Sequence, residues 1–293
     1  MSKLGMISLG LFVLTFSTPV HAMNKVVYGT DDRRDIYQET NAEYIDLAAS
    51  TAAMIPNQKM NALGDDVTIA GSTLGQQGIC SDAKFADHVT AANCSGFLVG
   101  EDLLVTAGHC MKSMGDCNGS KWVFGYAYET SDITSSITVS KENVYGCKEI
   151  IEQDLSGSTQ MDFALIRLDR KVTDREPLKV RTEGKIDNAE NIVVIGHPTG
   201  LPTKIADNAW VRNNHSNVFF SANLDTFGGN SGSAVFNAET GVVEGILVRG
   251  EQDYVYDWSK GCRVPKQCTN DSCRGEDVTR ITNVTKLMEI LKK

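Results

Sequence analysis

The sequence has no stretch that is dense in lysine and arginine, no internal repeat and no low-complexity tract. Its 28 Lys and Arg residues are outnumbered by 37 Asp and Glu residues, which leaves a formal net charge of -9. A phosphate backbone therefore meets no complementary basic surface, and nucleic acid is excluded as a partner. Only six prolines are scattered along the 293 residues, so composition marks no linker. With 41% hydrophobic and 22% charged residues, the chain is expected to be globular.

The eight cysteines lack the paired close spacings of a zinc module. An even number of this size is unusual in a reducing compartment, so we expect disulfides. Acidic residues such as Asp31, Asp32 and Asp154 stand apart from other ligand types, so they predict no metal site. No cofactor is expected.

The first 22 residues have the pattern of a secretory signal peptide. Lys3 supplies a positive start, Leu4 to Phe16 is nearly all apolar, and Ala22 is a small residue at the expected cleavage point. The alternative is an uncleaved anchor, but the apolar run is shorter than the roughly 20 residues that a membrane-spanning helix needs. We expect a secreted chain, extracellular or periplasmic, with no membrane contact after cleavage.

Short β-branched or alternating runs recur through the rest of the chain, separated by clusters of Gly, Asn and Asp. This pattern is typical of an all-β sandwich or barrel protein. The tail differs, because its apolar residues follow helical spacing and predict a helix at about 278–292. A second, weaker helical pattern covers residues 40–54. The expected strands are 66–70, 96–99, 103–106, 121–124, 163–168, 192–195, 218–220, 234–236 and 241–248.

Three segments carry the residue types of nucleophilic catalysis. His109 follows a predicted strand and precedes Cys110, and a bridge from Cys110 to Cys94 would restrict the loop that carries the imidazole. Asp162 stands at the start of an apolar strand, where a buried carboxylate can hold a histidine in one tautomer. Ser231 lies among glycines that permit positive φ values. Each segment alone has a structural explanation, but together they give the order His, Asp, Ser that one known triad uses.

These segments resemble the signature motifs of trypsin/chymotrypsin-like serine peptidases. The matching runs are Thr106–Cys110, Asp162–Leu165 and Gly229–Ser233, and the serine motif is closest to the bacterial glutamyl-endopeptidase branch. The resemblance implies two six-stranded antiparallel β-barrels with a C-terminal α-helix. It divides the chain into a peptidase domain at 65–293, with barrel one at about 65–185 and barrel two at about 186–275. It covers residues 34–64 poorly.

The roles implied by the resemblance follow the matched positions. Ser231 would be the nucleophile, His109 the general base and then acid, and Asp162 the residue that orients the imidazole. The backbone N–H groups of Gly229 and Ser231 would form the oxyanion hole. The resemblance therefore implies an endopeptidase that acts on proteins or peptides through an acyl-enzyme, and we expect a monomer.

Substrate preference follows from the segments that would line the primary specificity pocket. The resemblance places Asp225 at its floor, with Thr226, Leu247 and Gly250 as further substrate-binding residues. A buried carboxylate favours cleavage after Lys or Arg. The alternative is Glu or Asp specificity, with Arg249 or a free Val26 amino group as the cation. A non-catalytic secreted binding module on the same fold is the second alternative.

Residues 23–64 are expected to be either a propeptide or an ordered strap across the barrels. Residues 26–33 faintly resemble the mature amino terminus of the glutamyl-endopeptidase branch. Lys25 before Val26 would permit self-processing by an enzyme that cleaves after basic residues.

Overall fold

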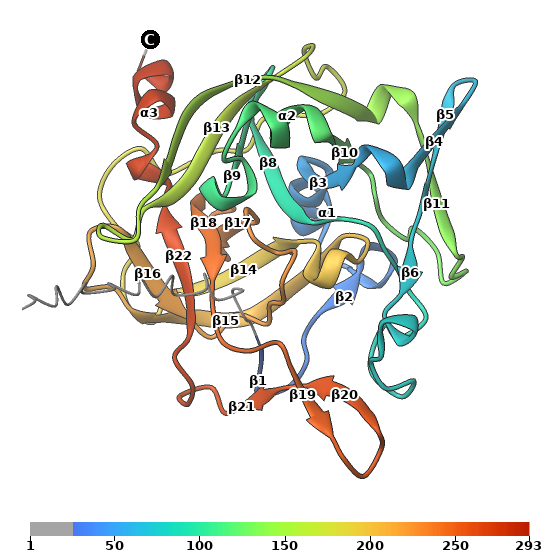
Figure 1. Cartoon of the computed structure of the whole chain (residues 1–293). Helices are drawn as coiled ribbons and strands as arrows, with labels where there is room; N and C mark the ends of the chain where they lie inside the picture. The colour runs from blue at the N-terminus through green and yellow to red at the C-terminus, as the bar shows by residue number, and fades with distance from the viewer. Residues whose placement is uncertain (1–25, 293) are drawn as a thin grey trace, which may run out of the picture.

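Two antiparallel barrels, each closed by six strands, form the body of the structure (Figure 1). The computed structural model describes residues 26–292. The first barrel contains β3 (Thr51–Pro56), β8 (Cys94–Gly100), β9 (Leu103–Thr106), β10 (Ser120–Phe124), β12 (Val144–Leu155) and β13 (Asp162–Leu168). The second contains β14 (Asn191–Gly196), β15 (Lys204–Asn213), β16 (Phe219–Ala222), β17 (Ala234–Asn237), β18 (Val243–Arg249) and β22 (Glu276–Arg280). The fold class predicted from the motifs is confirmed.

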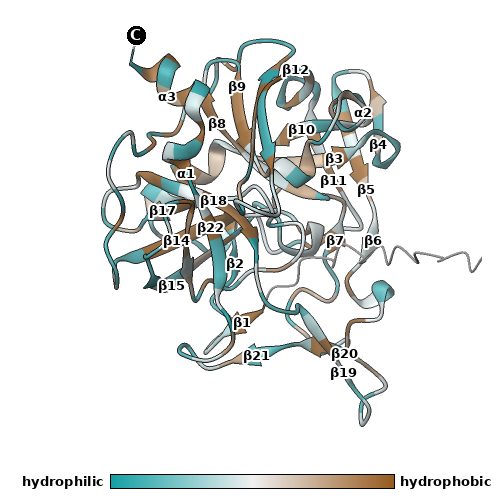
Figure 2. Cartoon of the chain, turned by 60° about the vertical axis from the view of Figure 1, so that its left-hand side comes forward, coloured by the Kyte–Doolittle hydropathy of each residue, from teal (hydrophilic) through white to brown (hydrophobic). Residues whose placement is uncertain are grey.

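Apolar side chains fill both barrels and the junction between them. Leu104, Val105 and Ile166 of the first barrel and Ile195 and Ile246 of the second are fully buried in one continuous cluster. Burying one such side chain stabilises the fold by about 1.5–3 kcal/mol relative to leaving it exposed. Apolar residues accordingly follow strands such as β9 and β18, and polar residues gather at the connections (Figure 2). The shared cluster fixes the two barrels against each other.

The first barrel begins before residue 65, where the sequence placed its boundary. β3 pairs with β8 on one side and with β10 on the other, so this strand closes the barrel. The weak helical pattern at 40–54 divides into α1 (Ala42–Ala49) and the start of β3. Residues from 51 onward are therefore part of the barrel, because removing them would leave two strands with unpaired edges.

Residues 26–35, which we call the strap, cross from the second barrel toward the first (Figure 1). Their strand β1 (Val27–Tyr28) pairs in parallel with β21 (Gln267–Cys268), and β2 (Arg34–Asp35) pairs with β15. Lys204 on β15 forms a buried ion pair with Asp35 of the strap. Of the two expectations for residues 23–64, an ordered strap describes the part from residue 26 onward.

The C-terminal helix is shorter than predicted. Residues 276–280 form β22, which pairs with β16 and β18, and α3 spans Thr285–Leu291. Val278 and Thr279 are β-branched and fully buried between those two strands, so tertiary pairing overrides the helical spacing there. One further helix, α2 (Met114–Gly119), lies between β9 and β10 in the sequence.

Several short strands lie outside the barrels. β4 (Met60–Leu63), β5 (Asp66–Ala70) and β11 (Ser136–Ser140) form a three-stranded sheet. β6 (Ser72–Thr73) pairs with β7 (Val89–Thr90), and β19 (Tyr254–Asp257) with β20 (Cys262–Pro265) makes a hairpin that projects from the second barrel (Figure 1). The base of this hairpin, at Asp253, contacts the turn that carries Ser231 through the backbone N–H of Gly228.

All eight cysteines are paired. The predicted bridge Cys94–Cys110 is present, with its Cα atoms 6.3 Å apart. The other pairs are Cys80–Cys262, Cys117–Cys147 and Cys268–Cys273. Four disulfides indicate a chain that folds outside the reducing cytoplasm.

The predicted signal peptide lies outside the described residues. Within residues 26–292, every helix is too short or too polar to cross a bilayer.

Candidate active site

The imidazole of His109 is held by the carboxylate of Asp162. β13 begins at Asp162 and pairs with β9, whose last residue Thr106 lies opposite Ala164. The turn after β9 (Gly108–Cys110) therefore brings His109 back over the start of β13. Asp162 Oδ2 lies 2.8 Å from His109 Nδ1, and Asp162 Oδ1 accepts the backbone N–H of His109 at 3.0 Å. Two bonds to one carboxylate fix both the ring orientation and the tautomer, with the proton on Nδ1.

Ser231 lies in a tight turn between β16 and β17. Gly229 and Gly232 have φ values of +92° and +90°, a region that favours glycine. A Cβ at position 229 would lie 2.6 Å from the carbonyl oxygen of His197, so the close approach also requires glycine. The glycines predicted to hold the serine turn are therefore needed for its backbone.

The serine turn packs directly against the loop that carries the imidazole. The carbonyl of Ser231 accepts the backbone N–H of Ser95 on β8 at 2.8 Å, and Cys110 Sγ lies 3.8 Å from the same oxygen. The disulfide Cys94–Cys110 thus joins the residues next to Ser95 and His109. No direct hydrogen bond between Ser231 Oγ and His109 Nε2 is present in the described residues. Such a bond is often long before substrate binds and tightens only in the complex.

The backbone N–H groups of residues 228–233, which we call the serine turn, are bonded within the protein with two exceptions. Gly228 donates to Asp253 Oδ2 at 2.9 Å, Asn230 donates to the carbonyl of Phe227 at 3.0 Å, and Gly232 donates to the carbonyl of Leu247 at 2.7 Å. Among residues 26–292, the N–H groups of Gly229 and Ser231 have no protein acceptor. Ser231 is buried and Gly229 is half-buried, so two N–H groups without a protein partner in this one turn are suited to bind an external oxygen.

The carboxylate of Asp225, predicted to lie at the pocket floor, is bonded to the strap. Its carboxylate is 4% exposed and faces the strap, accepting the backbone N–H of Tyr28 at 2.6 Å and that of Asp32 at 2.8 Å. Burial raises the pKa of Asp225 to about 7, against the lowering effect of those two N–H groups. Asp225 therefore holds the strap in place, and its oxygens are turned toward main-chain amides.

A different carboxylate, that of Glu276, lies between the two segments predicted to line the specificity pocket. The hydroxyl of Thr226 donates to Glu276 Oε2 at 2.6 Å, and the backbone N–H of Glu251 donates to Oε1 at 3.1 Å. A Cβ at Gly250 would lie 1.8 Å from Oε2, so only glycine fits beside this carboxylate. Thr226 and Gly250 thus surround an acid that sequence reasoning missed, while Leu247 is fully buried in the apolar core of the second barrel.

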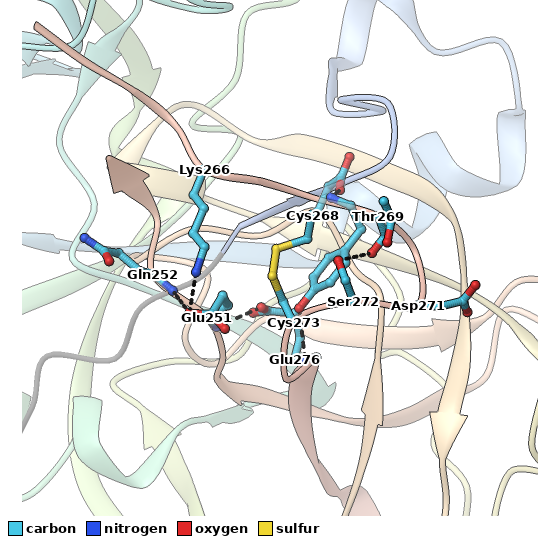
Figure 3. Close-up of a disulfide and its surroundings, with 12 residues drawn as sticks. Glu251, Gln252, Lys266, Cys268, Thr269, Asp271, Ser272, Cys273 and Glu276 are labelled. Atoms are coloured by element: carbon cyan, nitrogen blue, oxygen red, sulfur yellow. Dashed lines mark hydrogen bonds and ion pairs between the residues drawn. A yellow bond between two sulfur atoms is a disulfide. The ribbon is translucent and has the colours of Figure 1, made fainter. Parts of the chain in front are cut away.

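Glu276 lies close to a second carboxylate, that of Glu251. Figure 3 shows Glu276 beside Glu251, whose carboxylate pairs with Lys266 at 2.9 Å, and near the disulfide Cys268–Cys273. Burial, followed by the negative charge of Glu276, raises the pKa of the Tyr28 hydroxyl. The strap residue Tyr28 therefore lies next to the same acid. Because the pairing register of β18 with β22 brings Glu276 here, the sequence alone carried no signal for it.

Arg249 is engaged within the second barrel. Its Nε donates to Asp277 Oδ2 at 2.9 Å, its Nη2 donates to the carbonyl of Gln160 at 3.2 Å, and its guanidinium lies over the ring of Phe219. The charge of Arg249 is thus balanced by a neighbouring carboxylate and is poorly placed to receive an acidic substrate.

Cys94, His109 and Cys110 are grouped closely enough to resemble a metal-binding set. The two cysteines are joined in a disulfide, so they offer no thiolate. The remaining ligand, His109, is held by Asp162 as described above.

Comparisons with known proteins agree with this geometry. The family model described as trypsin-like peptidase domain matches residues 94–246. A search of curated proteins found no significant match.

Solved structures resemble the chain in fold. A Glu endopeptidase in complex with MPD has 16% identity and a TM-score of 0.54, with 91% of this chain and 99% of that chain covered. The Vibrio cholerae VesB protease has 12% identity and a TM-score of 0.52, with coverage of 90% and 68%. Human heparin binding protein has 12% identity and a TM-score of 0.53, with coverage of 88% and 94%. At these identities the likeness concerns the fold.

Proposed function

The chain belongs to the trypsin-like peptidase family, and from this premise we propose that it is a serine endopeptidase that works through an acyl-enzyme. The observation that carries the proposal is the bond of 2.8 Å between His109 and Asp162, beside a serine turn with two N–H groups left for an external oxygen. An acyl-transfer enzyme needs a nucleophile, an oriented base and an oxyanion site, and these residues provide all three.

In this mechanism Ser231 Oγ attacks the carbonyl carbon of the substrate, and His109 Nε2 takes the hydroxyl proton. Asp162 keeps the proton on Nδ1 and stabilises the imidazolium that forms. The N–H groups of Gly229 and Ser231 bind the oxyanion of the tetrahedral intermediate. His109 then protonates the leaving amine, and the same imidazole activates the water that hydrolyses the ester.

We propose that cleavage follows Lys or Arg, and that Glu276 is the acid that selects them. A carboxylate buried between Thr226 and Gly250 favours a cationic side chain and disfavours an acidic one, because like charges in a buried site repel strongly. The Thr226 hydroxyl and the Glu251 backbone N–H both bind this carboxylate, which fixes it beside the segments predicted to line the pocket. The preference predicted from Asp225 is thus kept, with a different residue as its basis.

The two alternatives are less well supported. Specificity for Glu or Asp requires a cation near the substrate side chain, and Arg249 is already paired with Asp277. The other cation for this alternative, a free Val26 amino group, would belong to a residue that is fully buried. A non-catalytic binding module has no need of an oriented His109–Asp162 pair. The likeness to a Glu endopeptidase concerns the fold alone.

We also propose that the protein is secreted and that its mature form begins at Val26. The four disulfides support export. Val26 is fully buried and its carbonyl accepts the backbone N–H of Thr226 at 3.3 Å, so a cut after Lys25 would leave the strap attached. Amino-terminal sequencing of secreted protein should read Val26. Reading Met23, or a residue beyond Arg34, would reject this processing site.

The function is tested with paired fluorogenic peptides that differ only in having Arg or Glu before the scissile bond. We expect hydrolysis of the Arg peptide and labelling of Ser231 by a fluorophosphonate probe, both abolished in Ser231→Ala. If the probe labels Ser231 but only the Glu peptide is hydrolysed, the proposed specificity is wrong and the proposed mechanism stands. Absence of labelling in the wild type would favour the binding module.

A further inference from the structure

We infer that Thr199 is a positioning residue for the oxyanion hole and that the hydroxyl of Tyr254 holds it in place. This inference rests on the proposed function of Ser231 and Gly229. Thr199 lies in the turn Pro198–Gly200, whose backbone meets the serine turn at Gly228. It touches neither the triad nor the acid Glu276, so its role would be to set the direction of a main-chain donor.

The argument begins with the peptide that joins Gly228 and Gly229. The backbone N–H of Thr199 donates to the carbonyl of Gly228. This peptide is planar and trans, so its C=O and its N–H point in opposite directions. Holding the Gly228 carbonyl toward Thr199 therefore aims the N–H of Gly229 away from it, toward the place that the oxyanion would occupy.

The next peptide is fixed in the same way by Ser95. The Ser95 hydroxyl donates to the carbonyl of Gly229 at 2.9 Å and accepts the backbone N–H of His197 at 3.0 Å. A hydroxyl that both donates and accepts has a single orientation. The peptides on either side of Gly229 are thus bonded to one short segment, residues 197–199, directly or through one hydroxyl.

Thr199 reaches this position through a strained backbone. Its φ and ψ are 53° and 23°, a left-handed conformation that is uncommon for a β-branched residue. Strain of this kind persists only where the surroundings enforce it. Without that conformation the Thr199 N–H would not point at Gly228.

The hydroxyl of Tyr254 provides the enforcing contact. Thr199 Oγ1 lies 2.8 Å from the Tyr254 hydroxyl, and the Tyr254 ring packs on Phe227, with centroids 5.1 Å apart. The neighbouring Asp253 binds the N–H of Gly228. The base of the β19–β20 hairpin therefore holds the peptide before Gly228, while Thr199 holds the peptide after it.

The test compares Tyr254→Phe, Thr199→Val and the double variant with the wild type. Each single change removes one hydroxyl and keeps the shape of the side chain. We expect kcat to fall about 10-fold in each, less than the 10²–10³-fold seen when an oxyanion donor is removed outright. KM should stay within about twofold, and affinity for a peptide boronate should fall in parallel with kcat/KM, because both depend on the oxyanion site.

The double variant tests whether Tyr254 acts on the oxyanion site through Thr199. If Tyr254 acts through Thr199, the double variant loses no more activity than either single variant. Thr199→Ser keeps the hydroxyl and should retain near wild-type kcat. Tyr256→Phe, two residues along β19 with its side chain half exposed, is the matched control and should leave kcat unchanged.

Thermal melting controls for folding. Kinetic constants are compared only among variants whose melting temperature matches that of the wild type, so that a loss of kcat reports on the oxyanion site. Unchanged kcat and boronate affinity in both single variants would overturn the inference while leaving the peptidase function intact. A wild type that neither hydrolyses peptides nor reacts with fluorophosphonate would overturn the function and the inference together.

Discussion

Asp162 and Asp225 are both buried carboxylates that the sequence placed at the active site, and the structure gives them different partners. Asp162 binds one backbone N–H and the imidazole of His109. Asp225 binds two backbone N–H groups, both from a strap almost 200 residues earlier in the chain. Asp162 orients a titratable side chain, whereas Asp225 ties two distant segments of the chain together. Burial and position alone did not distinguish them.

The largest effect should come from Asp162→Asn. Asparagine fits the same space but stabilises the wrong imidazole tautomer, so kcat on an Arg peptide should fall about 10⁴-fold with little change in melting temperature. Ser231→Ala gives the floor of activity for this measurement. Retention of a tenth of the wild-type kcat would show that Asp162 does not orient His109.

The second prediction tests whether Glu276 or Asp225 determines the preference for an Arg substrate. Glu276→Gln removes a buried charge opposite the substrate cation, and we expect kcat/KM for an Arg peptide to fall about 10²-fold while that for a Leu peptide changes little. Asp225→Asn is the control and should preserve the ratio of the two values. A loss of Arg preference in Asp225→Asn, and not in Glu276→Gln, would reverse the assignment.

The third effect concerns stability. Asp225→Asn places an amide NH₂ against one of the two backbone N–H groups, so the free energy of unfolding should fall by about 1–3 kcal/mol. Denaturant unfolding measures the loss, and proteolysis of the strap should speed up. Asp82→Asn, at an exposed surface ion pair with Lys260, is the control and should change stability by less than about 1 kcal/mol.

The smallest effect is a pH dependence at His88, whose Nδ1 lies 3.9 Å from Oδ1 of the strap residue Asp35. Burial, followed by the charge of Lys204, lowers the pKa of His88 from 6.5 to about 4. Between these pH values His88 is protonated in the unfolded chain and neutral in the folded chain. The free energy of unfolding therefore decreases as the pH falls from 6.5 to about 4. The loss from this one group should be roughly 1–2 kcal/mol. His88→Asn should flatten that part of the stability profile measured by denaturant unfolding. An unchanged profile would show that His88 does not contribute to the acid sensitivity.

The sequence predicted the strands whose apolar residues are continuous or cleanly alternating. Residues 103–106, 163–168 and 192–195 belong to β9, β13 and β14, which are buried on both faces. β12 was missed because most of its residues are partly exposed, which removes the contrast between its faces. β15 was missed because Lys204, buried against Asp35, looks like a surface residue in the sequence.

The contacts of His109 and the shape of the serine turn follow from local motifs, and the chain order indicated how they combine. The role of Glu276 depends instead on how β22 registers against β18, with Arg249 opposite Asp277 and a register shift beside it. Such a register is set by the packing of the whole barrel. The contact of Thr199 with Tyr254 likewise joins two loops far apart in sequence, so no local pattern announces it.

The bridge between Cys80 and Cys262 spans 182 residues and is the one disulfide that ties the first half of the chain to the second. Protease molecules in solution can cleave one another. Any single nick between residues 148 and 261 would produce two pieces that stay linked through this sulfur pair. Such material would run as one band on a gel without reductant and as two bands with it, and it would keep its barrels in register for further turnover.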